Sequence, residues 1–282
     1  MLNIFTVQNE KPKGIRERVS SFIHPYEIKT RIRSAAGIKI RETVYIRRRG
    51  KINWHAVAKS IGESRAILCE KDLTLLGSPF RKTESSALGA AWCEKFVCQV
   101  LETLAESDIY PRISFYDPFA EFSDFAKDLS SYTEQLTVIT EMPKFYENEA
   151  QHLHDTTGAV MKVTNDTDRI FPCDMLIIPD KLRDIIHAPA LTPVFTSCPA
   201  YVSLSGTVID GYCVSLPEIY RPLCPDGIDE TELMNALYDT ENANILAGIV
   251  PESALCAGKK ITVKEAAELV KRSITPLLSS CD

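Results

Sequence analysis

The chain has 282 residues, of which 45% are hydrophobic and 25% are charged, and its formal net charge is −6. These values describe an ordinary globular protein whose length favours two domains or one large domain. No stretch approaches the ~18 apolar residues of a membrane span, and the first residues lack a signal-peptide pattern. We therefore expect a cytoplasmic protein with no membrane segment.

The first hundred residues combine one strong strand pattern with two helix patterns. In residues 38–49, alternation of apolar and polar side chains predicts an antiparallel strand with one solvated face. The predicted inward residues are Ile38, Ile40, Val44 and Ile46, and the predicted outward residues are Lys39, Arg41, Tyr45 and Arg47. Asn53 is placed to cap a helix over residues 54–61, which Gly62 ends. A short strand over residues 66–69 follows.

A long helix is predicted over residues 84–106, and it closes the N-terminal part. Its apolar stripe consists of Cys93, Val97, Val100, Leu101 and Leu104. The break at residues 108–111 predicts a domain boundary. Residues 1–110 are therefore expected to form a small α+β domain.

From residue 111 the pattern changes to alternating strands and helices. Strands are predicted over residues 113–116, 136–140, 159–163, 175–179 and 193–197, with helices over 122–129 and 143–157. Only about a dozen residues join the third strand to the fourth, so a loop or single turn is expected there. Residues 200–228 look irregular apart from short strands near Val208 and Tyr212. Helices return at 230–238 and 263–272, the latter with Thr262 and Glu265 in capping-box spacing.

This alternation predicts an α/β fold over residues 111–282, with a mainly parallel sheet and helices on both faces. The segment RIFPCDMLIIPD, residues 169–180, places Cys173 and Asp174 after a polar lead-in and before a buried strand. In this respect residues 111–200 resemble a Rossmann-like domain, most closely that of shikimate-dehydrogenase-like and glutamyl-tRNA-reductase-like proteins. The resemblance implies a nucleotide-binding framework.

The first strand-to-helix turn departs from that family. The family has G-x-G-x-x-G there, whereas this chain has Asp117-Pro118-Phe119 and no glycine between Pro111 and Gln135. Asp117 and Pro118 suit the N-cap and first position of the next helix. An ionised Asp117 would repel a phosphate at that helix end. NAD(P) binding is therefore disfavoured, and the cofactor, if any, is unknown.

The resemblance also implies a role for Glu141, because an acidic residue after the second strand binds the adenine ribose of NAD in such proteins. The alternative is that Glu141 is a solvated residue before the helix that Pro143 begins. The second interpretation is favoured.

A ligand site is expected where parallel strands end, because ligands of open α/β sheets bind outside the carboxyl ends of the strands. The candidates are Asp117, Thr140, Glu141, Asn165, Asp180, Thr196 and Ser197. This acidic, hydroxyl-rich set suits a cation, a sugar or an amine better than a phosphate. Each of these residues is also a common helix cap or loop former, which is the structural alternative.

No catalytic or metal motif accompanies this site. Nucleophile-elbow, phosphate-loop and zinc-protease motifs are all missing, so catalytic residues stay unassigned and an enzymatic role stays open. His152 and His154 are two apart on a helix and point in different directions. The nine cysteines include no Cys-x-x-Cys pair and are interpreted as reduced core residues.

Two other function classes remain open. Residues 1–100 hold 19 Lys and Arg against 9 Asp and Glu, and the rest of the chain has a net charge of −16. The charge split favours a protein-interaction module in which basic and acidic parts dock, within a chain or in a homo-oligomer. Nucleic-acid binding through Arg47, Arg48, Arg49 and the helix after Asn53 is less favoured, because the pI is ≈ 5.5 and no recognition helix follows.

Overall fold

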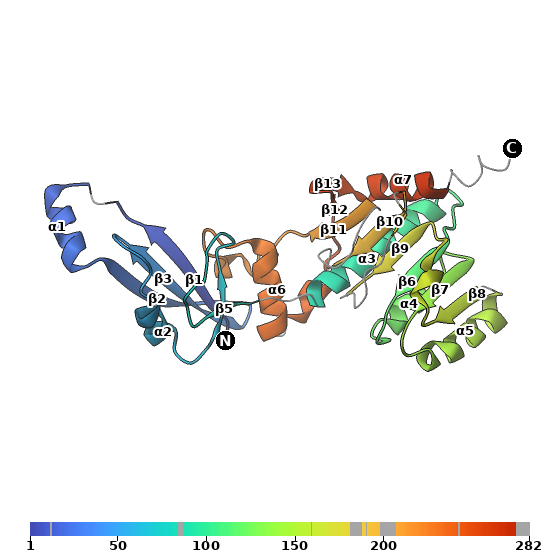
Figure 1. The fold of residues 1–282 in the computed structure, drawn as a ribbon, viewed down its shortest axis with the longest axis horizontal. Coiled ribbons are helices and arrows are strands. Elements are labelled where there is room, and N and C mark those ends of the chain that lie inside the picture. The colour runs from blue at the N-terminus through green and yellow to red at the C-terminus, as the bar shows by residue number, and fades with distance from the viewer. Residues whose placement is uncertain are drawn as a thin grey trace. The chain divides into compact units, whose positions relative to one another are not determined.

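The structure is a computed structural model that describes residues 1–11, 13–83, 87–158, 160–180, 188–189, 191–197, 207–241 and 243–274. The chain forms two compact units (Figure 1). Unit 1 contains Met1–Ser85 and Ser215–Leu246, and unit 2 contains Ser86–Val214 and Ala247–Asp282. Among the described helices, none is both long enough and apolar enough to cross a bilayer.

Unit 1 is built on a five-stranded mixed sheet in the order β2-β3-β1-β4-β5. The strands are β1 Asn3–Asn9, β2 Tyr26–Ala35, β3 Ile38–Arg47, β4 Ala66–Cys69 and β5 Arg81–Lys82. Only the β2–β3 pair is antiparallel. The helices of the unit are α1 Ile15–Ile23, α2 Trp54–Ile61, η3 Arg221–Leu223 and α6 Glu230–Glu241.

The helix α2 confirms its sequence prediction, because it spans Trp54–Ile61 and the Asn53 side chain accepts a hydrogen bond from Ala56 N at 3.1 Å. The predicted strand over residues 38–49 also exists as β3, but its predicted environment is wrong. Strand β3 lies inside the sheet, antiparallel to β2 and parallel to β1. Tyr45, predicted to face solvent, is fully buried in a core cluster with Phe5, Val57 and Ile67. Helix α2, whose Val57 and Ile61 belong to the same cluster, packs on the face of β3 that was expected to be open.

Unit 2 is built on an eight-stranded sheet in the order β13-β12-β11-β10-β9-β6-β7-β8. Its strands are β6 Ile113–Tyr116, β7 Gln135–Ile139, β8 Val160–Thr164, β9 Met175–Ile178, β10 Pro193–Thr196, β11 Thr207–Cys213, β12 Ser253–Cys256 and β13 Lys259–Thr262. Six of them, β6 to β11, are parallel, and β12 and β13 add an antiparallel hairpin at one edge. The predicted α/β class with a mainly parallel sheet is therefore confirmed.

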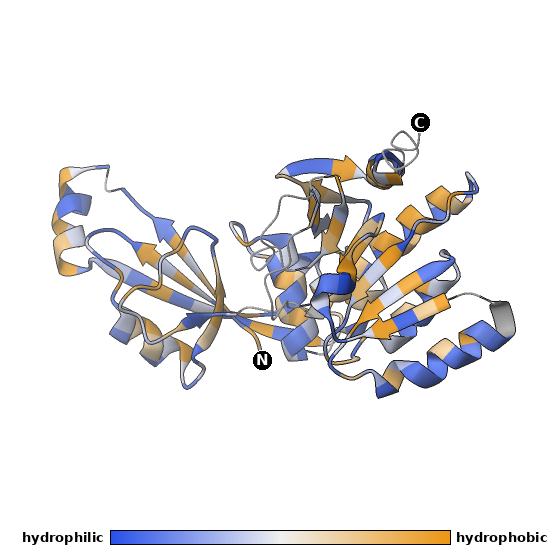
Figure 2. Cartoon of the chain, turned by 45° about the vertical axis from the view of Figure 1, so that its right-hand side comes forward, coloured by the Kyte–Doolittle hydropathy of each residue, from blue (hydrophilic) through white to orange (hydrophobic). Residues whose placement is uncertain are grey.

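Helices and apolar contacts cover both faces of this sheet, whose strands are mostly hydrophobic in Figure 2. The helices of unit 2 are α3 Ala87–Ala105, α4 Ser123–Ser130, α5 Lys144–Thr157, η1 Thr167–Ile170, η4 Asn244–Gly248 in part, and α7 Val263–Ile274. On one face, Phe125 of α4 packs on Phe115 and Phe96 of α3 packs on Phe195. On the other face, Ile170 of η1 joins a core cluster with Leu176 and Val194. The single turn η1 is the short connection expected between the third and fourth strands.

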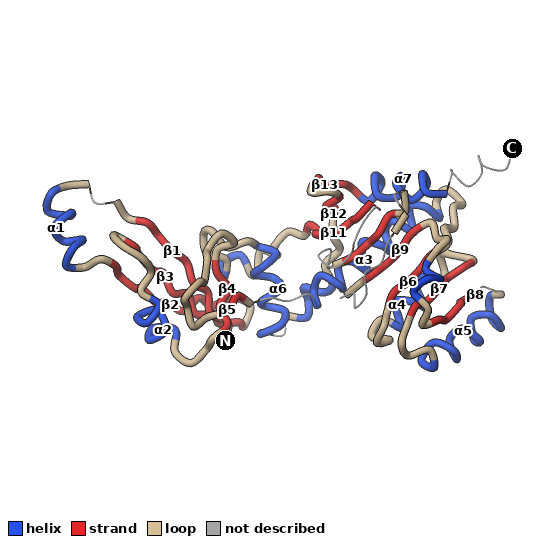
Figure 3. The backbone as a smooth tube through the Cα atoms, viewed as in Figure 1, coloured by secondary structure: helices blue, strands red, loops and turns tan. Residues whose placement is uncertain are grey.

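The two units divide the chain differently from the predicted boundary near residue 110. Helix α3 packs with α7 and with strands β10 and β11, so it belongs to unit 2. Helix α6, predicted within the second domain, packs against β4 of unit 1. Figure 3 shows the loops that lead into and out of α6. Residues 200–206 of the predicted irregular segment and residues 84–86 of the predicted long helix lie outside the described residues.

Candidate functional site

The parallel strands of unit 2 reverse their order between β6 and β9. Counted along the chain, the six parallel strands lie in the order third, second, first, fourth, fifth, sixth. In open α/β sheets this order places a ligand crevice at the carboxyl ends of the first and fourth strands, where the connections diverge. The site expected from topology therefore lies beside Asp117, which follows β6, and Asp180, which follows β9.

Asp117 is 1% exposed and holds the turn after β6 together. Its Oδ1 accepts a hydrogen bond from Glu121 N at 3.0 Å, and its Oδ2 accepts one from Phe122 N at 2.9 Å. A bound phosphate would need backbone N–H groups of this kind. The carboxylate of the chain itself therefore takes the place in which an anion would be bound.

The predicted capping geometry at Asp117 is wrong in one respect. Helix α4 begins at Ser123, with Phe122 at the N-cap and no side-chain cap. Ala120 has a φ of 56°, in the left-handed region, so residues 118–122 cannot continue as regular helix. Asp117 consequently caps the turn before the helix, and Pro118 does not begin α4.

Tyr146 of α5 completes the surroundings of Asp117. Its hydroxyl donates a hydrogen bond to Asp117 Oδ2, and both side chains are buried. Burial, together with this hydrogen bond and the nearby carboxylate charge, holds the pKa of Tyr146 well above its ordinary value. The tyrosine therefore stays a neutral donor, and it ties the first turn of the sheet to α5.

The hollow at the switch point is small. It has a volume of ≈ 10 Å³ for a water-sized molecule, close to the space that one water needs. Its lining consists of Tyr116, Asp117, Pro118, Phe119, Glu121, Phe122 and Asp180. Within the described residues, this hollow has no room for a pyrophosphate unless the Asp117 turn moves.

Thr140 and Glu141, after β7, lie against the same turn. Thr140 is buried, and its hydroxyl donates to Pro118 O at 3.4 Å and accepts from Met142 N at 3.1 Å. Glu141 N donates to Pro118 O at 3.1 Å, while the Glu141 side chain is exposed. Thr140 thus has a structural part in joining two loops, and Glu141 presents its carboxylate at the rim.

The remaining predicted residues lie at or just after the carboxyl ends of their strands. Ser197, after β10, donates a hydrogen bond to Pro179 O at 2.5 Å, next to the partly buried Asp180. Thr196 is fully buried in β10, and Asn165 is exposed after β8 and does not line the hollow. The fold therefore gathers Asp117, Thr140, Glu141, Asp180 and Ser197, and leaves Asn165 at the margin.

Glu94 of α3 is an acidic residue near this site that the sequence patterns did not single out. Its pKa is raised from 4.5 to about 7, chiefly by burial and also by the negative charges of Asp128 and Asp117, against the opposing effect of Lys95. Near neutral pH such a carboxyl group exists in both protonation states, which is the property required of a general acid or base. The sequence offered one sign of this buried carboxyl group, because Glu94 is next to Cys93 in the apolar stripe of the predicted long helix.

Glu94→Gln is expected to change how stability depends on pH. The pKa of Glu94 is higher in the folded protein than in the unfolded chain, so its contribution to stability is greatest below pH 4.5 and is lost as pH rises through about 7. Glutamine stays neutral throughout. Relative to the wild type, the variant should gain about 1–3 kcal/mol between pH 4.5 and pH 8, measured by urea unfolding. A difference that is constant with pH would contradict an elevated pKa.

Unit 1 contains a second polar pocket that sequence reasoning missed. Its volume is ≈ 280 Å³, and it is lined by Leu68, Cys69, Lys82, Thr83, Glu232, Asn235 and Ala236. Among the described residues, Thr83 Oγ1 and Asn235 Oδ1 are buried without a hydrogen-bond partner. Lys82 Nζ donates to Lys71 O at 2.8 Å. Strand β5 and helix α6 bring these groups together from positions about 150 residues apart.

The basic segment of unit 1 is engaged in contacts within the unit. Arg48 pairs with Glu10 at 2.7 Å and with Glu27 at 2.8 Å, and Arg47 Nε donates to Asn9 Oδ1 at 2.7 Å. Helix α2 is followed by strand β4, so no second helix of a helix-turn-helix motif follows it. Trp54 packs on Phe5 in the core. The basic segment is therefore a charged region at the end of β3, paired with residues at the ends of its neighbours β1 and β2.

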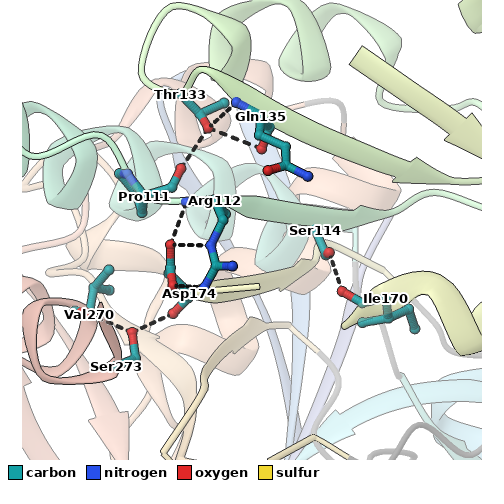
Figure 4. A network of polar contacts seen from close by, with 9 residues as sticks. All are labelled: Pro111, Arg112, Ser114, Thr133, Gln135, Ile170, Asp174, Val270 and Ser273. Atoms are coloured by element: carbon teal, nitrogen blue, oxygen red, sulfur yellow. Dashed lines mark hydrogen bonds and ion pairs between the residues drawn. The ribbon is translucent and has the colours of Figure 1, made fainter. Parts of the chain in front are cut away.

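Asp174, from the segment that carried the resemblance, lies at the amino ends of the strands, opposite the carboxyl ends that form the candidate site. Its carboxylate binds Arg112 three times, through the backbone N at 2.7 Å, Nε at 3.1 Å and Nη2 at 2.7 Å (Figure 4). Ser273 of α7 donates to Asp174 O at 2.7 Å. The residue therefore joins the starts of β6 and β9 and the end of α7, and its part is structural.

Metal-ligating side chains do not converge in the described part of the chain, where no group of three His, Cys, Asp or Glu residues is placed to hold an ion. His152 and His154 are both exposed on α5. The cysteines that the structure describes form no disulfide bond with one another, and Cys69, Cys93 and Cys173 are buried.

Comparisons with known proteins give only weak similarity. No protein-family model matches the sequence, and no curated protein matches it. An L-tryptophan dehydrogenase from Nostoc punctiforme is similar in structure with a TM-score of 0.32 and 12% identity, over 97% of this chain and 89% of that one. A shikimate 5-dehydrogenase-like protein gives a TM-score of 0.23 and 10% identity, over 96% and 97%. The chain is thus weakly similar in structure to two dehydrogenase-like proteins, and no family is identified for it.

Proposed function

We propose that unit 2 binds a small polar ligand, neutral or cationic, at the carboxyl ends of β6, β7, β9 and β10. The observation that carries the proposal is the reversal of strand order between β6 and β9, because crevices at such points are where open α/β sheets bind ligands. The ligand would lie over the rim of the one-water hollow beside Asp117 and not inside it, where Glu141 and Asp180 supply carboxylates and Ser197 supplies a hydroxyl. Amines, sugars and other hydroxyl-bearing molecules are the ligands that such groups bind.

A dinucleotide is a poor candidate because the Asp117 carboxylate occupies the place that its pyrophosphate would need. The Glu121 and Phe122 amides already donate to the Asp117 carboxylate. A pyrophosphate would have to displace this charge and would be repelled by it. The proposed ligand therefore carries no phosphate at this position.

The test is a thermal-shift screen with amines and sugars as probes and with NAD⁺ and NADP⁺ beside them. A ligand at ~100 times its Kd stabilises a protein by ~2.7 kcal/mol, which is a readily measured shift. We expect an amine or sugar to raise the melting temperature and the two dinucleotides to have no effect. In the variant Glu141→Gln/Asp180→Asn, which leaves the buried Asp117 intact, the shift should disappear.

A matched control separates this site from the pocket of unit 1. The variant Lys82→Met/Glu232→Gln removes two charged groups from that pocket and none from unit 2. It should keep the ligand response of the wild type. Loss of the response in this control, with the response intact in Glu141→Gln/Asp180→Asn, would refute the proposal and place the ligand in unit 1.

A further inference from the structure

Helix α1 presents an apolar surface outward. Its residues Ile15, Val19, Phe22 and Ile23 are between 57% and 81% exposed. Their spacing of four, three and one residues places them on one side of the helix. In Figure 2 the leftmost helix, α1, carries orange segments. Contiguous exposed apolar residues of this kind mark interaction sites in globular proteins.

The side of α1 that faces its own unit is polar. Ser21 is the buried residue of the helix, and its hydroxyl donates to Arg18 O at 2.7 Å. Glu17 and Ser20 line a polar hollow of ≈ 440 Å³ together with Glu10, Lys11, Lys13, Ser21 and Arg48. A helix at the surface of a globular unit normally has the opposite orientation, with its apolar side inward. The outward apolar residues of α1 therefore have no role in folding unit 1.

Basic residues surround these apolar residues. Lys13, Arg16 and Arg18 are exposed around the helix, and the Arg49 guanidinium lies 3.7 Å from the centre of the Phe22 ring. We call Ile15, Val19, Phe22 and Ile23 with these cations the basic-rimmed stripe. Two copies of this stripe would repel each other, because like charges would meet at their rims. The complementary surface must combine apolar side chains with an acidic rim.

Unit 2 has a surface of this description. Phe119, Met142 and Phe145 are between 38% and 60% exposed. Phe119 and Met142 lie on adjoining loops, because Glu141 N donates to Pro118 O at 3.1 Å, and Phe145 lies in the first turn of α5, where its N donates to Met142 O at 3.1 Å. The exposed residues Glu121, Glu141 and Glu147 lie within two residues of them along the chain, and these three carboxylates outnumber the exposed cation Lys144. We call these six residues the acidic-rimmed patch.

We propose that the basic-rimmed stripe of one copy of this chain docks on the acidic-rimmed patch of a second copy. Apolar side chains meet at the centre and opposite charges meet at the rim, which is the usual composition of a specific protein interface. The division of the sequence into a basic first hundred residues and an acidic remainder then has a physical cause. The contact goes beyond ligand binding and needs no ligand, although the acidic-rimmed patch shares Glu141 with the proposed ligand site.

The first test is the mass of the protein in solution, measured by sedimentation equilibrium at micromolar concentrations. Wild-type protein should have a mass above the 31.5 kDa of one chain, and high salt should weaken the association because it screens the rim charges. The variant Val19→Asp/Phe22→Asp changes only exposed side chains, so it should fold normally. It should associate at least ~10-fold more weakly, since each 1.4 kcal/mol changes affinity tenfold.

The second test is charge reversal on each surface. Arg16→Glu/Arg18→Glu and Glu121→Lys/Glu147→Lys should each weaken self-association. An equimolar mixture of the two should associate, because the unchanged patch of the first variant meets the unchanged stripe of the second, and the two reversed surfaces also carry opposite charges. The control Lys51→Glu/Lys59→Glu makes the same change in charge at exposed positions outside the stripe and should behave as wild type.

Three outcomes would overturn the proposal. One is a wild-type protein that stays monomeric at the highest concentrations measured. Another is a mixture of the two charge-reversed variants that remains monomeric. The third is a monomeric wild type that binds phosphatidylserine vesicles through α1, because the stripe would then be a lipid-binding surface.

Discussion

Replacement of Asp117 by alanine should lower the free energy of unfolding of unit 2 by about 3–5 kcal/mol. The carboxylate is buried and accepts three hydrogen bonds, from Glu121 N, Phe122 N and the Tyr146 hydroxyl. Alanine would leave all three donors without a partner in a space too small for more than about one water. Each unsatisfied buried donor costs about 1–3 kcal/mol, so the loss should be among the largest in the chain.

The measurement exploits the placement of the two tryptophans. Trp54 lies in unit 1 and Trp92 is buried in α3 of unit 2, so in a Trp54→Phe background the fluorescence reports on unit 2. Urea unfolding in this background gives the stability change directly. As a control, Tyr146→Phe removes one of the three donors and should cost about 1–2 kcal/mol. If Asp117→Ala cost no more than Tyr146→Phe, the two backbone hydrogen bonds would contribute nothing.

Replacement of Asp174 by alanine should destabilise unit 2 by about 2–4 kcal/mol. The mutation removes a nearly buried carboxylate that receives the Arg112 backbone N–H and two guanidinium N–H groups (Figure 4). The start of β6 would lose its link to the start of β9, and the Arg112 amide would lose its acceptor. The candidate ligand site is at the carboxyl ends of the strands, away from Asp174 at their amino ends, so ligand affinity should remain unchanged.

A double-mutant cycle with Arg112→Ala separates the ion pair from the backbone contact. If the side-chain pair contributes, the sum of the two single losses in unfolding free energy should exceed the loss in the double variant by about 0.5–3 kcal/mol. Arg112→Ala alone should cost less than Asp174→Ala, because it leaves the amide-to-carboxylate bond intact. Strictly additive losses would show that the guanidinium contributes no energy.

Much of unit 2 could be predicted from the sequence because its elements are determined locally. The strand β6, the helix α5 with Gly158 at its C-cap, and the capping box of Thr262 and Glu265 all depend on neighbouring residues, and the structure confirms each of them. The predicted site residues could be assigned to strand ends for the same reason. Their gathering at one edge follows from the parallel arrangement, which the alternation of strands and helices indicates.

What could not be predicted depends on contacts between distant residues. Strand β1 has no alternating pattern because its first residues are all buried, and the helical spacing of the apolar residues in α1 does not reveal that they face outward. The raised pKa of Glu94 arises from burial and from charges on other elements. The pocket with Lys82 and Asn235 needs strand β5 beside helix α6, and no local sequence pattern indicates that pairing.

Unit 1 is built from two separate segments of the chain, Met1–Ser85 and Ser215–Leu246, and this affects how it folds on the ribosome. The N-terminal ammonium group lies 3.1 Å from Glu241, and Leu2 N donates to the same carboxylate at 2.8 Å. At a synthesis rate of about 5–20 residues per second, the first residue waits roughly 10–50 s for this partner. Unit 1 therefore stays incomplete while most of unit 2 is being made, although it contains the N-terminus. A nascent chain stalled before residue 230 should expose the side of β4 that α6 later covers, and chaperones that bind apolar surfaces should recognise it there.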